Sequence, residues 1–288
     1  MDISAIVTTS HNPDSANLDM ERRFGALARL YGSAGAKRIR AAHIVVVGLG
    51  GVGSWAAEAA ARSGVARLTL LDLDHIAESN INRQIHALDS TLGQAKVQAM
   101  RERIAQINPH CQVDCIEEFV DAENWPGILS LDTLFDRKQL AVIDACDQVK
   151  AKSAMATWAI NNKVSLISVG AAGGKRLAHR VDIDDLSQVT HDPLLAQMRY
   201  RLRKEHGAAR VGKMGVMCVF SREAVMQPTT KSALTQQMNI AENIPIQQVA
   251  SQAQTDGSLN CHGYGSIVSV TSTFGMCAAS WALNKIAG

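Results

Sequence analysis

The hydrophobic pattern of the chain alternates short apolar runs with longer alanine-rich stretches. The runs with the length and β-branched content of buried strands lie at 41–47, 67–74 and 140–146. The stretches with helical length lie at about 54–62, 95–108 and 149–162. Each helix follows a strand, so the pattern predicts an α/β fold built on a largely parallel sheet.

A glycine-rich loop, GLGGVG, separates the first strand from its helix. Gly48 and Gly50 can adopt backbone angles closed to larger residues, and Gly53 lets the helix pack closely. The N-terminus of that helix offers free N–H groups and a positive dipole to an anion. Asp72 follows about twenty residues later, where a carboxylate can accept hydrogen bonds from a ribose. This spacing predicts a nucleotide site, and it fits NAD or FAD as well as ATP.

An unusually polar segment follows the second strand and ends at Lys96. A dehydrogenase has no evident need for it, whereas breaking a phosphoanhydride requires neutralisation of charge on non-bridging oxygens. A guanidinium at Arg83 and an ammonium at Lys96 suit that task, with nearby carboxylates to hold magnesium. Either residue alone reads as a solvated surface charge, but together they favour ATP. The other residues of this segment that we assign to nucleotide binding are Asp74, Asn80, Asn82 and Gln84.

Six motifs occur along the chain in the order GLGGVG, LLDLD, SNINRQ, GQAK, INP and DACD. With them, the chain resembles the ubiquitin-activating-enzyme-like adenylating superfamily of the ThiF type, from about Arg23 to the C-terminus. The resemblance implies a Rossmann-like ATP-binding core whose central, largely parallel sheet is extended by additional strands and a C-terminal helix. It also implies that a carboxylate attacks the α-phosphate of ATP, releasing pyrophosphate and leaving an acyl-adenylate.

The resemblance also implies roles for individual residues. Asp72 matches the ribose-binding acid of the superfamily. The residues that match its phosphate contacts are Asn80, Arg83 and Lys96. Asp147 matches the acid near the α-phosphate and magnesium, and Asp144 in the same motif is a further nucleotide-binding candidate. Alternatively, one of these two aspartates caps the helix predicted at 149–162.

Members of the superfamily carry an N-terminal arginine that reaches the ATP of the partner subunit, usually within an R-x-x-R element. The resemblance therefore implies a homodimer. In this chain Arg23 and Arg29 lie six residues apart, and Ala26 occupies the expected second position. Either arginine is a candidate for the contact in trans, and a solvated helix face is the alternative.

The six cysteines form no C-x-x-C pair, whereas relatives that activate sulfur-carrier proteins often carry two such pairs for zinc. We therefore expect no structural zinc, and a core of this size needs no disulfide framework. Cys111 and Cys115 lie four residues apart in a predicted strand, so both belong to one face. Cys218 and Cys261 are candidates for accepting a persulfide from a sulfur-transfer partner.

Composition predicts one globular domain over residues 21–288, which by the resemblance is an adenylating domain, with a disordered segment before it at 1–20. The net charge of +2 does not indicate a nucleic-acid partner by itself, and nothing points to DNA. The segment 175–213, however, reads as a basic insert that could meet the phosphates of a folded RNA. The candidate contacts are Arg199, Arg201, Arg203, Lys204, Arg210 and Lys213. The alternative is an exposed amphipathic helix with ordinary solvated charges.

The C-terminal stretch is apolar but interrupted by serine, threonine and glycine, which makes it a poor membrane span. Its pattern predicts a strand at 265–270 followed by a helix at 272–286. The polar segment at about 226–262 reads as a long loop or mobile crossover. No secretory signal begins the chain, so we expect a cytoplasmic protein.

Further motifs resemble one branch of the superfamily that modifies tRNA: RFGALARLYG, SNINRQIHAL, VIDACDQVKAK, VGAAGGK and GVMCVFSRE. That branch implies adenylation of the threonyl carboxylate of threonylcarbamoyladenosine next to the anticodon. Intramolecular attack would then close a ring and expel AMP, with the backbone of Gly50 and Gly51 holding phosphates. The rival interpretations are adenylation of the C-terminus of a sulfur-carrier or ubiquitin-like protein, and an NAD-dependent oxidoreductase.

Overall fold

The computed structural model describes residues 20–129, 136–226 and 264–288. Within these ranges the chain forms a seven-stranded sheet with the strand order β3-β2-β1-β4-β5-β7-β6. The strands are β1 (His43–Val47), β2 (Arg67–Leu71), β3 (Gln112–Ile116), β4 (Leu140–Asp144), β5 (Ser165–Val169), β6 (Val181–Asp185) and β7 (Met217–Ser221). Every neighbouring pair is parallel except β6 and β7, so the prediction of a largely parallel sheet is confirmed.

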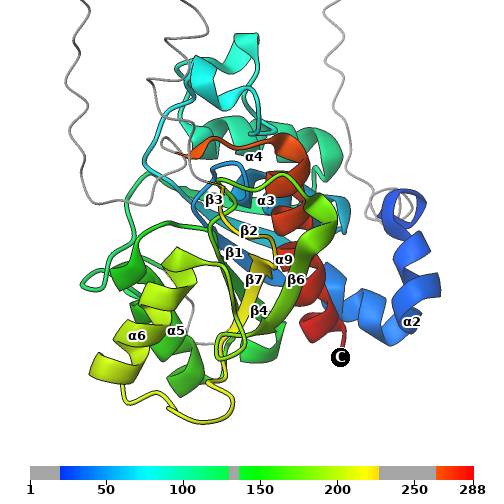
Figure 1. Cartoon of the computed structure of the whole chain (residues 1–288). Helices are drawn as coiled ribbons and strands as arrows, with labels where there is room; N and C mark the ends of the chain where they lie inside the picture. Colours follow the sequence, from blue (N-terminus) through cyan, green and yellow to red (C-terminus); the bar gives the residue numbers. More distant parts are fainter. Residues whose placement is uncertain (1–19, 130–135, 227–263) are drawn as a thin grey trace, which may run out of the picture.

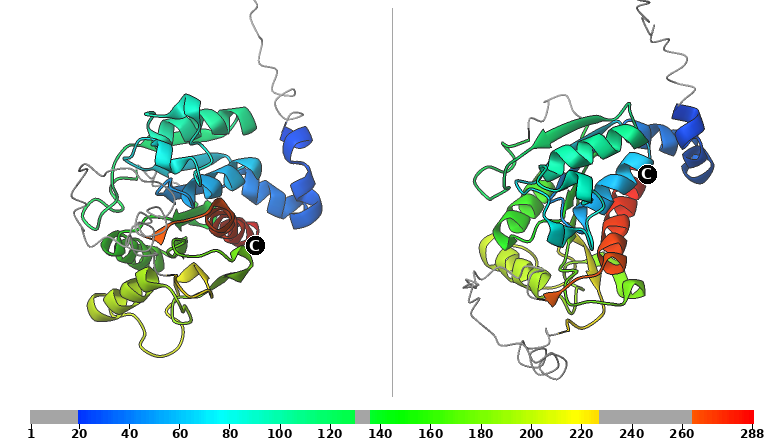
Figure 2. Two further views of the ribbon diagram at one scale, coloured as in Figure 1. Left: turned by 45° about the horizontal axis from the view of Figure 1, so that its top comes forward. Right: turned by 90° about the horizontal axis from the view of Figure 1, so that it is seen from above.

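Helices cover both faces of this sheet (Figures 1 and 2). The longer helices are α2 (Ala26–Arg40), α3 (Gly53–Arg62), α4 (Lys96–Ile107), α5 (Val149–Asn162), α6 (Pro193–Glu205) and α9 (Val268–Ala287). Short 3-10 turns are η1 (Glu78–Asn80), η2 (Asp89–Thr91), η3 (Arg137–Gln139) and η4 (Ala178–Arg180). Helices α3, α4 and α9 pack on one face, and α5 and α6 pack on the other.

Strand β1 is apolar from Ile44 to Val47 because successive side chains point to opposite faces of the sheet and both faces are covered. Ile44 and Val46 join the core beneath α3 and α9, whereas Val45 and Val47 join the core beneath α5. All five residues of β1 are buried. A central parallel strand covered on both faces favours apolar residues on both faces, as from Ile44 to Val47, and the buried His43 at its start is paired with Thr69 at 2.7 Å.

The predicted strand at 265–270 is wrong, because α9 already begins at Val268. Five buried residues of this helix follow one another at intervals of four: Val270, Phe274, Ala278, Ala282 and Ile286. That spacing forms one helical stripe against the sheet and outweighs the β-branched content of the segment. No helix among the described residues is long and apolar enough to span a membrane.

The basic segment 175–213 is not an appendage to the fold. It supplies β6, which lies at the edge of the sheet, and α6, which packs beside α5. Several of its apolar residues, such as Leu195, Met198 and Leu202, therefore belong to the core and are not available to a partner. The segments predicted to be disordered or mobile, at 1–20 and 226–262, fall almost entirely outside the described residues.

Close packing of α9 against α3 predicts the effect of a single methyl group. A Cβ atom at Gly275 would lie 2.4 Å from the carbonyl oxygen of Val52 and 3.0 Å from the backbone nitrogen of Ala56. Alanine favours a helix over glycine by about 1 kcal/mol, but two backbones must separate to admit it. We expect Gly275→Ala to lower the free energy of unfolding by about 1–3 kcal/mol.

Urea denaturation measures this change. Ser280→Ala, on the exposed side of the same helix, serves as the control and should leave the urea midpoint within the range of a neutral surface substitution. Equal midpoints for Gly275→Ala and the unsubstituted protein would contradict the packing argument.

Candidate nucleotide-binding site

A cavity of about 480 Å³ opens where the central parallel strands end. It is lined by the turn after β1, the segment from the end of β2 to η1, the turn between β4 and α5, and the turn after β5. Predicted site residues in its wall are Gly48, Gly50, Gly51, Asp72, Asp74, Asn80, Arg83, Gln84, Lys96 and Asp147. Gly53, Asn82 and Asp144 are predicted site residues that do not line it.

The glycine loop has the geometry that its sequence predicts. Gly48 has a φ of +86°, which strains any residue with a side chain, and a Cβ at Gly53 would lie 1.8 Å from the Gly48 carbonyl oxygen. A Cβ at Gly50 would meet no atom within 4 Å, so the backbone there faces open space. Gly50 therefore leaves room in the cavity, whereas Gly48 and Gly53 allow the loop and helix to approach each other.

Asp72 is fixed by backbone amides at the end of β2. Its Oδ2 accepts a hydrogen bond from the Leu49 amide at 2.6 Å, and its Oδ1 accepts one from the Asp74 amide at 2.9 Å. Burial raises the pKa of the Asp72 carboxyl above its usual value, although Lys96 and the two amides oppose that shift. A carboxylate has acceptor sites for about four hydrogen bonds, so capacity for ribose hydroxyls remains.

Lys96 lies between two carboxylates at the start of α4. Its ammonium is 2.7 Å from Oδ2 of Asp74 and 3.6 Å from Oδ1 of Asp72. The Lys96 side chain is only 6% exposed, whereas that of Asp74 is 58% exposed. The contact with Asp74 is therefore the one that an incoming anion can most easily replace.

Arg83 is attached to the glycine loop and to its own turn. Its Nη1 donates to the Ser79 carbonyl at 2.7 Å and to Oδ1 of Asn82 at 2.9 Å. The aliphatic stem packs against Gly51, where a Cβ would lie 3.0 Å from the Arg83 Cγ. The indole of Trp55 in α3 donates to the Arg83 carbonyl at 2.9 Å. These contacts hold the guanidinium next to the glycine loop.

The three amide residues of the polar segment differ in their surroundings. Asn80 is buried, and its Oδ1 accepts from the Ala77 amide at 3.0 Å, so it shapes η1. Asn82 is exposed and donates to the Ser266 carbonyl at 3.1 Å. Gln84 is buried in the cavity wall, and its Oε1 has no hydrogen-bond partner within the described part of the chain. Gln84 therefore lines the cavity wall, but its unpaired Oε1 is itself buried in this structure.

The two aspartates of the DACD motif have different environments. Asp147 is exposed in the cavity wall, and its Oδ1 accepts a long hydrogen bond from the side-chain amide of Gln148, at 3.4 Å. Asp144 is fully buried and lies 3.1 Å from the ammonium of Lys152. Gln148 is the N-cap of α5 and makes no side-chain cap, so neither aspartate caps this helix.

A magnesium ion would have Asp147 as its ligand in this cavity. The described residues contain no group of three or more His, Cys, Asp or Glu side chains able to hold a metal by themselves. Mg²⁺ commonly takes one or two protein carboxylates and completes its octahedron with substrate phosphates and water. A single exposed carboxylate beside a nucleotide site fits that donor set.

Lys152 was not predicted from the sequence to belong to this region, yet it pairs with Asp144 beneath the cavity. Both Lys152 and Asp144 have no exposed side-chain area. Burial lowers the pKa of the Lys152 ammonium, but the Asp144 carboxylate and Cys146 outweigh it, and the net pKa lies above its usual value. Lys152 occupies the same helical stripe as the buried Met155, Ala156 and Ala159. That periodicity is the signal that could have identified it as a buried cation.

The N-terminal arginines lie away from this cavity. Arg23 donates to the Ile107 carbonyl at 3.1 Å, at the end of α4 opposite Lys96. A helix of that length spans roughly 18 Å. Arg29 is exposed on α2, and neither arginine lines the cavity. A contact of either one with a nucleotide would therefore have to reach the site of another subunit.

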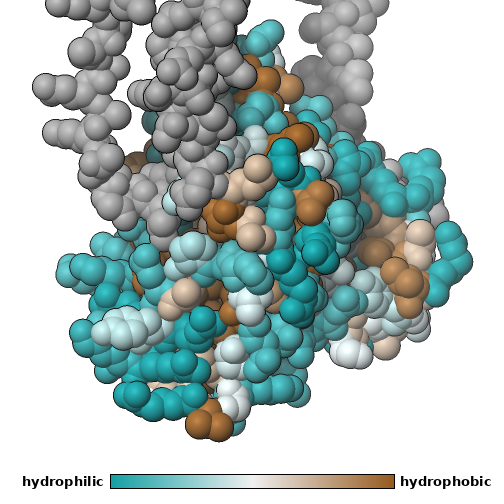
Figure 3. All heavy atoms as spheres, viewed as in Figure 1, coloured by the Kyte–Doolittle hydropathy of each residue, from teal (hydrophilic) through white to brown (hydrophobic). Residues whose placement is uncertain are grey.

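Some basic side chains of the segment 175–213 hold neighbouring groups of the fold, and others are exposed to solvent. Arg199 donates to the carbonyls of Leu186 and Val189, at 3.0 and 2.9 Å. Arg203 donates to two carbonyls of the loop after α6, and Arg201 forms an ion pair with Glu205 at 2.6 Å. The remaining candidates, Lys204, Arg210 and Lys213, are exposed. Figure 3 shows a mainly hydrophilic surface over this part of the molecule.

The cysteines behave as small apolar residues in the described part of the chain. Cys111 and Cys115 both pack against the core beneath α3 and α9, as the alternation predicted. Burial raises the pKa of the Cys111 thiol to about 12. Cys218 is fully buried, and burial raises the pKa of its thiol well above the usual range, which does not support a persulfide acceptor. Cys261 lies outside the described residues.

Comparisons with known proteins agree with this geometry. The chain is 40% identical over 267 residues to the tRNA threonylcarbamoyladenosine dehydratase of Escherichia coli, which covers 92% of this chain and 93% of that protein. It is 38% identical over 269 residues to the enzyme of the same name from Haemophilus influenzae, which covers 92% of this chain and 94% of that protein.

A crystal structure of the E. coli dehydratase in complex with ATP has a TM-score of 0.76 at 38% identity, and the match covers 93% of this chain and 95% of that chain. The ThiF family model matches residues 23–288. The resemblance found in the sequence is thereby confirmed, and the chain belongs to the ThiF family.

Proposed function

We propose that this protein uses ATP to dehydrate threonylcarbamoyladenosine in tRNA, through a carboxyl-adenylate and with release of pyrophosphate and AMP. The observation that carries the proposal is one cavity that combines the glycine loop, Asp72, Arg83, Lys96 and Asp147. Similarity to dehydratases over 92% of the chain supports the choice of substrate.

The cavity residues divide the work of binding ATP. Asp72 accepts hydrogen bonds from the ribose, and the backbone of Gly50, which faces open space, receives phosphates together with that of Gly51. Lys96 leaves the exposed carboxylate of Asp74 for a phosphate oxygen, and Arg83 adds a second cation. Asn80, Asn82 and Gln84 shape or extend this phosphate side.

The carboxylate of Asp147, in the cavity wall, would hold a magnesium ion bound with ATP. When bound, that ion would supply Lewis-acid neutralisation of phosphate charge. The chain itself orients the nucleotide, keeps both cations next to it and presents the carboxylate of Asp147. Asp144 does not line the cavity, so we assign it no direct contact with ATP.

The reaction needs no nucleophile from the protein. A carboxylate oxygen of the threonyl group bonds to the α-phosphorus while the bond to pyrophosphate breaks. A group of the same modified nucleoside then attacks the acyl carbon, and the bond to AMP breaks as the ring closes. Tethered attack of this kind has a high effective concentration, so positioning and charge stabilisation are the tasks left to the chain.

Residues 21–288 act in this proposal as one adenylating domain that pairs with a second copy. Arg23 or Arg29 would then supply a further cation to the ATP of the partner, since neither reaches the cavity of its own chain. The tRNA would extend from the cavity along α6. Leu194, in the first turn of that helix, lines the cavity, and the exposed Lys204 lies ten residues further on.

We expect Arg83→Ala and Lys96→Ala each to reduce AMP formation by about a hundredfold or more, because each removes a cation that stabilises phosphate charge. The assay supplies ATP, Mg²⁺ and tRNA bearing threonylcarbamoyladenosine, and it follows AMP and the mass of the nucleoside. Arg101→Ala, an exposed charge on α4, is the control and should keep full turnover.

Retained turnover in either variant would refute its assigned role. An unchanged nucleoside mass with verified modified tRNA and unsubstituted protein would refute the dehydratase proposal itself. If AMP then formed only with a carrier protein bearing a C-terminal carboxylate, the protein would still be an ATP-dependent adenylating enzyme, but its substrate would be that carrier protein.

Exposed basic residues in the last turn of α6 and in the loop after it are the candidate contacts with tRNA phosphates. We expect the combined substitution of Lys204, Arg210 and Lys213 by alanine to weaken tRNA binding and to lower the salt slope by about 0.7–0.9 per lost phosphate contact. Arg199→Ala should instead destabilise the fold, because its guanidinium holds two carbonyls. Binding titrations at several salt concentrations measure the slope, with Lys37→Ala on α2 as the control. An unchanged slope in the triple variant would contradict a tRNA contact at this surface.

A further inference from the structure

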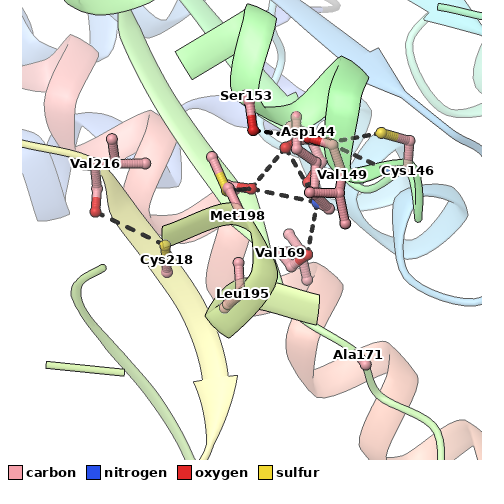
Figure 4. Close-up of polar contacts among 12 residues, drawn as sticks. Asp144, Cys146, Val149, Ser153, Val169, Ala171, Leu195, Met198, Val216 and Cys218 are labelled. Atoms are coloured by element: carbon pink, nitrogen blue, oxygen red, sulfur yellow. Dashed lines mark hydrogen bonds and ion pairs between the residues drawn. The ribbon is translucent and has the colours of Figure 1, made fainter. Parts of the chain in front are cut away.

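A buried cluster joins the ends of β4 and β5 beneath the cavity. The Lys152 ammonium lies 3.1 Å from Oδ2 of Asp144 and donates to the Val169 carbonyl at 2.8 Å. The Ser168 hydroxyl donates to the same Asp144 oxygen at 2.6 Å. On the other side, Oδ1 of Asp144 accepts from the amide and the thiol of Cys146, at 3.3 and 3.1 Å. Figure 4 shows Asp144 and Cys146 joined by these contacts, with Val169 nearby.

Stability alone does not account for this cluster. Removing two charges from water costs several kcal/mol per ion, and well-packed apolar residues of similar volume are often as stable or more stable. Lys152 and Asp144 are entirely buried among apolar residues of the core beneath α5, where such a replacement would fit. An ion pair at this position therefore calls for a reason other than the free energy of unfolding.

The two strand ends that the cluster joins continue directly into the cavity wall. Asp144 ends β4, and the next four residues, 145–148, all line the cavity and include Asp147. Val169 ends β5, and the next three residues, 170–172, also line it. Lys152 bonds to the carbonyls of both strand ends, at 3.3 Å for Asp144 and 2.8 Å for Val169. One ammonium thus fixes the starting points of two cavity walls.

We propose that Lys152 and Asp144 are positioning residues that hold the turn 145–148 so that the carboxylate of Asp147 meets magnesium bound to ATP. The inference rests on the ATP site of the proposed function and is independent of the tRNA substrate. Asp144 acts on this turn through the Cys146 amide, one residue before Asp147. Lys152 orients the Asp144 carboxylate toward that amide through the 3.1 Å contact with its Oδ2.

The test compares ATP affinity with and without Mg²⁺ in the full chain, by calorimetry. The variant is Asp144→Asn with Lys152→Met, which removes both charges together and leaves no unpaired buried ion. We expect its urea midpoint to stay near that of the unsubstituted protein, while the gain in ATP affinity from Mg²⁺ falls about tenfold. Losses of ten- to a hundredfold are typical when a group that orients a metal ligand is removed.

Asp147→Asn supplies the decisive comparison. If the ion pair acts through Asp147, adding Asp144→Asn and Lys152→Met to Asp147→Asn should not further change the increase in ATP affinity that Mg²⁺ produces. Additive losses, or an unchanged Mg²⁺ gain in the paired variant, would overturn the proposal. Lys150→Met, which removes an exposed cation from the same helix, is the matched control and should behave as the unsubstituted protein.

Ser168→Ala covers the case in which the paired variant does not fold. It removes one hydrogen-bond donor to Asp144 but leaves the Lys152–Asp144 ion pair in place. We expect it, too, to reduce the increase in ATP affinity that Mg²⁺ produces. An unchanged gain in a folded Ser168→Ala protein would then count against the proposal. Because these measurements need only ATP and Mg²⁺, a failure of the tRNA reaction would refute the proposed function and leave this inference standing.

Discussion

The parallel pairing of β1 with β2 on one side and β4 on the other is the constraint on which the site depends. In register, Val47 of β1 lies beside Leu71 of β2 and Asp144 of β4. The three strands therefore end at the same edge of the sheet, and the segments that follow them meet there. The glycine loop, Asp72 and Asp147 are far apart in the sequence and share one cavity for this reason.

Lysine–aspartate ion pairs are the second feature of this edge of the sheet. Lys96 is held by two carboxylates in the cavity wall, and Lys152 is held by Asp144 beneath it. Their environments give them different tasks. Asp74 is exposed and can yield Lys96 to a phosphate, whereas Asp144 and Lys152 have no water to replace their contact. A site that binds a polyanion can thus keep its cations oriented before the nucleotide arrives.

Much of the site could be predicted because it depends on local sequence. Gly48 and Gly53 are required by backbone angles and close approach, and both requirements appear in the motif itself. Asp72 follows from its distance to the loop along a strand and a helix of ordinary length. Motif spacing and the family resemblance together predicted Asp72, Arg83, Lys96 and Asp147 as residues of one nucleotide site, and all four line the cavity.

Other features depend on contacts between distant elements and could not be read from the chain. Nothing near Asp144 in the sequence shows that its carboxylate is covered by α5 and β5, so Asp144 was a nucleotide-binding candidate beside Asp147. Arg199 looked like a free basic residue because the carbonyls that it holds belong to the segment between β6 and α6. The strand predicted at 265–270 failed because β-branched residues at its end pack as a helical stripe against the sheet.

In the proposed reaction this cavity transfers AMP to the threonyl carboxylate of the modified nucleoside. Isotope transfer tests that step: tRNA in which both threonyl carboxylate oxygens are ¹⁸O is supplied, and the released AMP is analysed by mass spectrometry. Each AMP is expected to carry one ¹⁸O atom, because the carboxylate oxygen that attacked phosphorus leaves with it. AMP without ¹⁸O, formed together with the dehydrated nucleoside, would refute a carboxyl-adenylate.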